Sequence, residues 1–130
     1  MMHKLLIVEY RKSLKTLYED ELREDGYHIL FAGNEKEALN ITQQECPDLV
    51  ILSGEVVLLE GISFSEKLKR YCPNILILVN TADLKACENL LHSSDVPVDC
   101  IVKSSDLDLL KRRIKDTLTR DFSPIVTHGS

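Results

Sequence analysis

The sequence has no apolar run long enough to cross a bilayer and no secretory signal at its N-terminus. A membrane-spanning helix needs about 20 apolar residues, and a secretory signal needs a longer apolar region followed by a small-residue cleavage site. The first apolar stretch of this chain is short and leads directly into Glu9. We therefore predict a cytoplasmic protein that does not associate with membranes.

Metal-binding cysteine motifs are also missing. The four cysteines form no Cys-x-x-Cys pair, and no histidine lies at metal-ligand spacing to them. Cys46 and Cys72 each precede a proline in a predicted loop, whereas Cys87 and Cys100 fall in a predicted helix and a predicted strand. In a reducing compartment we expect all four to be free thiols that act as small hydrophobic side chains.

A strong excess of charge of one sign is absent as well. The chain has 16 Lys and Arg residues against 21 Asp and Glu residues, which leaves a net charge of −5. A mildly acidic domain has no electrostatic reason to bind nucleic acid or an anionic membrane. We therefore predict that this domain binds neither of them.

The chain does contain enough material for one hydrophobic core, with 130 residues of which 44% are hydrophobic. Internal repeats, low-complexity runs and interdomain linkers are not found. We expect residues 1–120 to form a single domain and residues 121–130 to be a flexible tail. The last three residues of that tail are either a cloning remnant or the start of a linker.

Five apolar stretches alternate with segments of helical spacing. Four of the five are nearly continuous apolar runs, which suit strands that are covered on both faces, as in a parallel sheet. The second stretch is more mixed and is typical of an edge strand. The predicted strands cover residues 4–8, 27–32, 48–52, 75–79 and 98–103.

The segments between the strands carry apolar residues at steps of three and four, as amphipathic helices do. Gly26 is expected to end the first helix in the left-handed conformation, and Asn34 to cap the second with Glu37 three residues later. Further helices are predicted over 62–71, over 83–92 and from a cap at Ser105 through Leu118. Such alternation predicts a three-layer α/β/α sandwich with right-handed crossovers.

In an open parallel sheet, ligands bind beyond the carboxyl ends of the strands. No glycine-rich G-x-G-x-x-G loop follows the first strand, so binding of a nucleotide or flavin is disfavoured. The polar or reactive residues expected at that edge are Glu9, Tyr10, Ser53, Glu55, Asn80, Thr81 and Lys103.

The order of these features resembles the response-regulator receiver family. The run at 5–8 leads into Glu9 much as the receiver opening leads into an acidic pair. Residues 47–53 look like the third receiver strand, Glu60 and Gly61 match its following acidic-glycine pair, and 99–103 resemble the fifth strand with its lysine. The similarity covers roughly residues 4–120 and lies in ordered coincidences rather than in one motif.

The resemblance implies a CheY-like fold with a five-stranded parallel sheet of order 2-1-3-4-5. It also implies a function, because receivers accept a phosphoryl group from a histidine kinase on a third-strand aspartate. The acidic pair and that aspartate hold Mg²⁺, while a threonine or serine and a lysine contact the phosphoryl oxygens.

This sequence departs from the family at the centre of that site. Ser53 stands at the position of the accepting aspartate, and a hydroxyl without an adjacent base is a poor nucleophile that cannot form an acyl phosphate. Tyr10 replaces the second acid of the pair, which leaves Glu9 as the only residual candidate for a metal ligand. Hard cations need several charged oxygen ligands, so we expect no cofactor and lost or weak Mg²⁺ binding.

The resemblance therefore implies a degenerate receiver pocket with no catalytic residue. We expect Tyr10 to fill the vacated metal site with its ring and Ser53 to be a small, inert filler. The remaining expectations are a solvated loop acid at Glu55, a helix cap at Thr81, and an ion pair between Lys103 and Glu9.

Our prediction is a non-phosphorylatable pseudo-receiver of a two-component signalling protein, which acts through protein–protein contacts and is not an enzyme. The implied partners are a histidine kinase, an output domain, another regulator or a second copy of the chain. Docking is expected through residues 83–118, whose charged face would include Lys111, Arg112, Arg113 and Lys115.

Two alternatives stay open. The first is an unorthodox phosphorelay receiver that uses another acceptor, such as Asp48 or Glu55. The second is a sensor that binds a small ligand at the altered strand tips, for which a shared architecture alone would be a weak argument.

Overall fold

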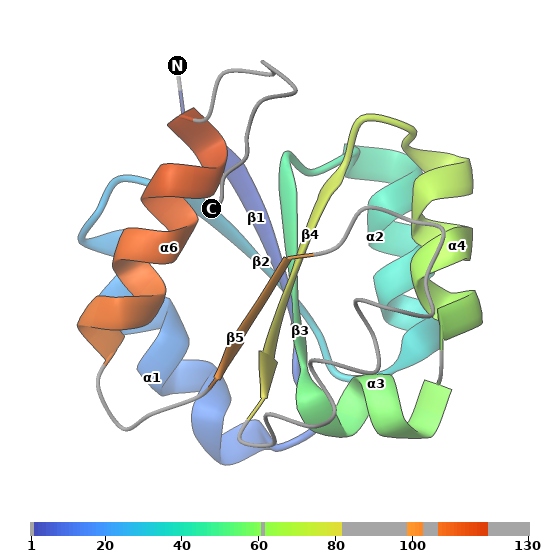
Figure 1. The fold of residues 1–130 in the computed structure, drawn as a ribbon, viewed down its shortest axis with the longest axis horizontal. Coiled ribbons are helices and arrows are strands. Elements are labelled where there is room, and N and C mark those ends of the chain that lie inside the picture. Colours follow the sequence, from blue (N-terminus) through green and yellow to red (C-terminus); the bar gives the residue numbers. More distant parts are fainter. Residues whose placement is uncertain (1, 61, 82–98, 103–106, 120–130) are drawn as a thin grey trace.

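The fold is a parallel sheet covered by helices on both faces (Figure 1). The computed structural model describes residues 2–60, 62–81, 99–102 and 107–119. In chain order the elements are β1 (Lys4–Val8), α1 (Lys12–Arg23), β2 (His28–Ala32), α2 (Glu35–Glu45), β3 (Leu49–Ser53), α3 (Gly54–Glu60), α4 (Ile62–Tyr71), β4 (Leu76–Thr81), β5 (Asp99–Val102) and α6 (Leu107–Thr119).

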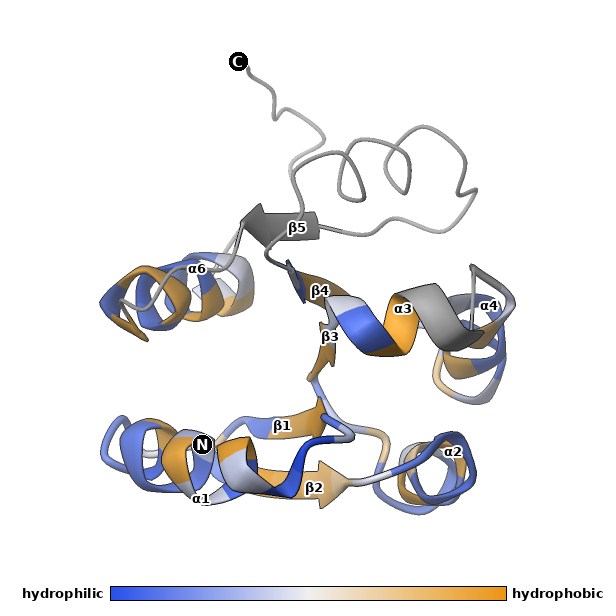
Figure 2. Ribbon diagram, turned by 90° about the horizontal axis from the view of Figure 1, so that it is seen from below, coloured by the Kyte–Doolittle hydropathy of each residue, from blue (hydrophilic) through white to orange (hydrophobic). Residues whose placement is uncertain are grey.

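The five strands run in the order β2-β1-β3-β4-β5, and every neighbouring pair is parallel. Figure 2 shows α1 and α6 on one face of this sheet and α2, α3 and α4 on the other. The predicted three-layer sandwich and strand order are therefore confirmed. Among the described residues, no helix is long and apolar enough to span a bilayer.

The apolar strand runs supply two cores at once. Successive side chains of a strand point to opposite faces, so Leu6 and Val8 of β1 join the cluster beneath α2 and α4. Leu5 and Ile7 join the second cluster, beneath α1 and α6. β3 divides its side chains in the same way, which explains why these strands show no polar alternation.

The helix ends follow the predicted local chemistry. Gly26 adopts a φ of +86° just after α1, in the left-handed region that favours glycine. Asn34 Oδ1 accepts a hydrogen bond from the Glu37 amide at 2.8 Å, and Glu37 Oε1 accepts one from the Gly33 amide at 2.8 Å. This reciprocal arrangement confirms the predicted cap of α2.

The helix predicted over 62–71 is found there as α4, and its Phe64 and Leu68 are buried. No helix was predicted where α3 lies, directly after β3. The predicted helix over 83–92 and the predicted cap at Ser105 lie outside the described residues.

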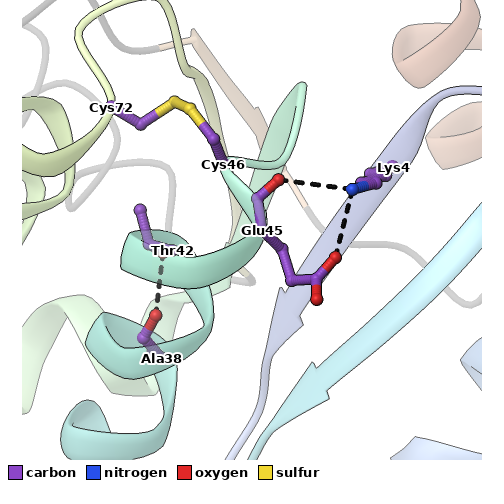
Figure 3. Close-up of a disulfide and its surroundings, with 6 residues drawn as sticks. All are labelled: Lys4, Ala38, Thr42, Glu45, Cys46 and Cys72. Carbon is purple, nitrogen blue, oxygen red and sulfur yellow. Dashed lines mark hydrogen bonds and ion pairs between the residues drawn. A yellow bond between two sulfur atoms is a disulfide. The ribbon is translucent and has the colours of Figure 1, made fainter.

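The prediction of four free thiols is wrong for two of the cysteines. Cys46 and Cys72 form a disulfide with a Cα–Cα distance of 5.6 Å (Figure 3). The pairing arises because Cys46 ends α2 and Cys72 directly follows α4, and these two helices pack side by side on one face of the sheet. The structure does not describe the side chains of Cys87 and Cys100.

Candidate functional site

Three of the predicted pocket residues meet at the carboxyl edge of the sheet. Glu9 follows β1, Ser53 ends β3 and Thr81 ends β4, and all three are about 95% buried, with exposures of 4%, 5% and 5%. Asn80, which pairs with Ser53 in the sheet register, is buried beside them. Lys103, and with it the predicted ion pair to Glu9, lies outside the described residues.

Between the strand tips lies a void of about 10 Å³. That volume is close to the minimum that a single water molecule requires. Its polar lining consists of Glu9, Tyr18, Ser53 and Asn80, and its apolar lining consists of Ile7, Val8 and Ile51.

Tyr18 was not predicted as a site residue, although its helical spacing to Leu14 and Leu22 placed it on the inner stripe of α1. Its hydroxyl accepts a hydrogen bond from Asn80 Nδ2 at 3.4 Å. Burial raises the pKa of the Tyr18 hydroxyl, and the negative charge of Glu9 raises it further, while Arg11 and the Asn80 bond oppose the shift. The site therefore holds this phenol in its neutral form.

The ring at the void belongs to Tyr18, not to Tyr10 as predicted. Tyr10 is half-buried and packs against the other core cluster, beneath α2 and α4, together with Val57. Tyr10 thus contributes apolar packing on the α2/α4 face.

Glu9 is held by its own loop. Its Oε2 accepts a hydrogen bond from the Arg11 amide at 3.1 Å and lies 3.8 Å from Arg11 Nε. Arg11 Nε also lies 3.7 Å from Oε2 of Glu55, which is exposed at the start of α3. The predicted solvated acid Glu55 therefore shares a cation with Glu9, and Arg11 was not foreseen as that cation.

The second oxygen of Glu9 is unusual. Oε1 is buried and has no hydrogen-bond partner among the described residues. A buried carboxylate oxygen without a partner is costly, and a single water in the adjoining void would satisfy it.

Ser53 has a structural role rather than being the inert filler that was predicted. Its Oγ accepts a hydrogen bond at 3.3 Å from the amide of Val56, the third residue of α3. This is the geometry of an N-cap, and it commits the hydroxyl to the backbone of its own loop.

The start of α3 sits directly against the end of β4. A Cβ atom added to Gly54 would overlap Thr81 Oγ1, and it would lie 2.6 Å from the Thr81 Cβ and 3.1 Å from the Thr81 Cα. Real Cβ atoms do not approach other atoms so closely, so residue 54 must be glycine for this packing. The main chain at Gly54 therefore packs directly against Thr81 at the end of β4.

Among the residues that line the void, Glu9 carries the only carboxylate. Mg²⁺ demands octahedral oxygen coordination at about 2.0–2.1 Å and retains several of its waters. The void has room for about one water molecule. No group of three His, Cys, Asp or Glu side chains able to hold a metal occurs in the described part of the chain.

A larger hollow of about 750 Å³ lies away from the strand tips. Its lining includes His3 before β1, Asp25 and Tyr27 before β2, and Lys111 and Lys115 of α6. The hollow therefore lies at the amino edge of the sheet, and it mixes acidic and basic groups.

The predicted docking face is described only in part, within 99–102 and 107–119. Arg112 and Lys115 are exposed on α6, as a docking surface requires. Lys111 instead donates a hydrogen bond at 2.9 Å to Glu21 Oε2 of α1. This cation therefore ties two helices of the same face together rather than facing a partner freely.

Comparison with known proteins gives the sequence a family context. Residues 5–115 match the family described as the response regulator receiver domain. Sporulation initiation phosphotransferase F of Bacillus subtilis is 32% identical over 82 residues, which make up 63% of this chain and 66% of that protein. The probable transcriptional regulator ycf27 of Porphyra purpurea is 29% identical over 90% of this chain and 48% of its own length.

Solved structures give the same result. The response regulator TrrA of Thermotoga maritima, crystallised with Mg²⁺-BeF, is 30% identical, with a TM-score of 0.75 over 90% of this chain and 99% of its own. A CheY-like receiver of Methanospirillum hungatei shares the fold at 21% identity and a TM-score of 0.76, covering 91% of this chain and 94% of its own. The chain spans about half the length of curated relatives such as ycf27 and PhoP of Bacillus subtilis.

Proposed function

Because this chain belongs to the response regulator receiver family, we propose that it is a receiver domain that is not phosphorylated on aspartate and that signals through protein–protein contacts. The family consists of signalling domains of two-component systems. The observation that carries the proposal is Ser53, which occupies the end of β3 and whose hydroxyl caps α3.

Three features of the strand tips support the loss of phosphoryl transfer. Ser53 Oγ has no base in place, because its described hydrogen bond is the one that it accepts from the Val56 amide. Glu9 Oε2 is engaged by the amide of Arg11. The void beside them has the volume of about one water, and Glu9 is the only carboxylate that lines it.

The decisive experiment treats the native chain with a small-molecule phosphodonor and Mg²⁺ and then measures its intact mass. We expect no acid-labile phosphoryl adduct under conditions that label a receiver carrying the aspartate. Melting temperature should also be unchanged by millimolar Mg²⁺, because a ligand that does not bind cannot shift the folding equilibrium. An adduct of one labile phosphoryl group on the native chain would refute the proposal.

A gain-of-function pair sharpens this test. The double variant Ser53→Asp with Tyr10→Asp returns two carboxylates to the tips beside Glu9, whereas Ser53→Asn with Tyr10→Asn matches their size without charge. Like charges at neighbouring strand tips repel each other, so the acidic variant should be less stable than the amide variant without metal. Mg²⁺ should restore stability and permit labelling in the acidic variant alone.

An unorthodox acceptor is the alternative that the same experiment addresses. Asp48 is a poor candidate, because its Oδ2 accepts the Lys4 amide at 2.8 Å at the amino edge of the sheet, at the opposite end of β3 from Ser53. Glu55 is exposed and lies near Arg11. Should the native chain be labelled, peptide mapping would identify the residue and favour this alternative.

The partner follows from the family and from the surface. The face of α6 that carries the exposed Arg112 and Lys115 is available to a partner. That partner would be a histidine kinase, an output domain, another regulator or a second copy of the chain. Binding that does not require phosphorylation should be the same with and without the phosphodonor. Sedimentation analysis of the chain, alone and with candidate partners, measures this directly.

A further inference from the structure

We propose that Cys46 and Cys72 are a thiol–disulfide modification site, whose oxidation by a small disulfide such as oxidised glutathione staples α2 to α4. The two cysteines are 26 residues apart in sequence. They lie at the ends of α2 and α4, which pack on the same face of the sheet. Nothing in the receiver pocket takes part in it, because the pair lies at the other end of the molecule.

The location of the two cysteines places them at the amino edge of the sheet. Cys46 follows α2 just before β3 begins, and Cys72 follows α4 just before β4 begins. Lys4 at the start of β1 lies close by, with its Nζ 3.1 Å from Glu45 Oε1 (Figure 3). The staple therefore acts on the entry loops of two central strands, while the candidate receiver pocket lies where those strands end.

The backbone at Cys46 is committed to a demanding conformation. Its φ of 43° and ψ of 67° lie in the left-handed region, and its amide still bonds to the Thr42 carbonyl at 3.0 Å. Glycine is the usual residue at such a helix end, because a side chain there costs free energy. The bond from Cys46 Sγ to Cys72 Sγ gives a reason for a cysteine, rather than a glycine, at this position.

The two ends of the bond differ in accessibility. Cys46 is an exposed residue, whereas Cys72 is only 3% exposed and belongs to the core cluster with Phe64 and Leu68 of α4. An external thiolate therefore reaches the Cys46 side of the disulfide. Attack there makes the buried Cys72 the leaving group. This asymmetry predicts slow reduction by small thiols.

The chemistry balances as ordinary thiol–disulfide exchange. The thiolate of a small thiol attacks Cys46 Sγ, the Sγ–Sγ bond breaks, and the Cys72 thiolate departs and takes up a proton. A second small thiolate then attacks the small-thiol sulfur of this mixed disulfide, so that the Cys46 thiolate leaves and takes up a proton while the small disulfide forms. The protein gains two electrons that the two small thiols lose, and the reverse sequence forms the staple.

Other links between α2 and α4 are weaker. One is the ion pair between Lys67 Nζ and Glu35 Oε1 at 3.1 Å, whose lysine side chain is 45% exposed. Exposed ion pairs of this kind contribute little to stability. Closing a loop of this length with a disulfide should raise the melting temperature by about 10 °C, since the cross-link restricts the unfolded chain.

The experiment uses the full chain purified without reductant. Free thiols are alkylated, the intact mass is measured, and peptide mapping locates the bonded pair. We expect Cys46 to be joined to Cys72 after incubation with oxidised glutathione, and a titration against glutathione buffers to follow a two-electron transition. The melting temperature should fall by roughly 10 °C when excess dithiothreitol opens the bond.

Two variants supply the controls. Cys46→Ser should melt at the same temperature with and without dithiothreitol, whereas Cys87→Ser should retain the full sensitivity of the native chain. The proposal is overturned if Cys46 and Cys72 both remain alkylatable after incubation with oxidised glutathione. It is also overturned if the bond maps to Cys87 or Cys100, or if opening it leaves the melting temperature unchanged.

Discussion

The closest packing at the candidate site can be tested by adding one methyl group to Gly54. In the variant Gly54→Ala, the new Cβ would overlap Thr81 Oγ1 and lie 2.6 Å from the Thr81 Cβ. The obstacle is not the end of a flexible side chain, because the main-chain Cα of Thr81 would also be only 3.1 Å away. Relief therefore requires α3 and β4 to move apart.

The magnitude follows from two opposing terms. Overpacking of a tight interior costs about 1–3 kcal/mol. Alanine in place of glycine restricts the unfolded chain and returns roughly 0.4–1 kcal/mol where its conformation is compatible. The balance is a loss of about 1–2 kcal/mol, which lowers the melting temperature of a chain of this size by roughly 3–8 °C.

Gly33→Ala is the matched control. A Cβ at Gly33 would meet only Glu37 Oε1, at 3.4 Å, which is an ordinary contact with the end of a flexible side chain. We expect this variant to be neutral or to gain up to about 1 kcal/mol. Urea unfolding with linear extrapolation measures both variants on one scale, and equal slopes would show that only stability has changed.

A double-mutant cycle identifies the cause of the loss. Thr81→Gly removes the overlapping Oγ1 and Cβ atoms, so Gly54→Ala should cost at least 1 kcal/mol less in that background than in the native chain. The steric argument fails if Gly54→Ala is as harmless as Gly33→Ala. It also fails if the cost of Gly54→Ala is the same with and without the Thr81 side chain.

Three further outcomes are expected from other parts of the molecule. Ser53→Ala removes the cap of α3 and should lower the free energy of unfolding by about 1 kcal/mol, whereas Ser53→Asn, which can also cap, should lose less in the same urea titration. The pKa of Tyr18 is raised in the folded state, so its contribution to stability is complete below the ordinary value near pH 10 and is lost as the pH rises through the folded pKa. Melting curves between pH 8 and pH 11 should therefore show a smaller alkaline loss for Tyr18→Phe than for the native chain, and equal losses would contradict the assignment. Cys46→Gly and Cys46→Ser both remove the disulfide, but glycine relieves the left-handed backbone, so Cys46→Gly should be the more stable of the two by about 0.5–1 kcal/mol in thermal or urea unfolding. The reverse order would show that the conformation at residue 46 carries no such cost.

The fold could be predicted from the sequence because its determinants are local and periodic. A strand buried on both faces is apolar along most of its length, and the runs at 5–8, 49–52 and 76–79 in β1, β3 and β4 satisfy that condition without reference to the rest of the chain. The cap at Asn34 and the left-handed turn at Gly26 likewise depend only on residues a few positions away. The identity of the residue at the end of β3, Ser53, is also a property of the sequence alone.

The interactions within the site could not be predicted in this way, because they join residues that are distant in the chain. Tyr18 meets Asn80 across 62 positions only because α1 lies on that face of the sheet. Cys46 and Cys72 have no spacing motif, and their pairing depends on how α2 packs against α4.

Sequence alone therefore determined the layered sheet and the serine at the end of β3, since both follow from residue type and local order. Tertiary structure decided that Arg11 bridges Glu9 and Glu55, that the void between the strand tips has a volume of about 10 Å³, and that two cysteines are joined. The physical reason is that strand and helix patterns depend on residues that are close in the chain. Charge pairing, cavity volume and disulfide geometry depend instead on distances that are set only when the layers pack together.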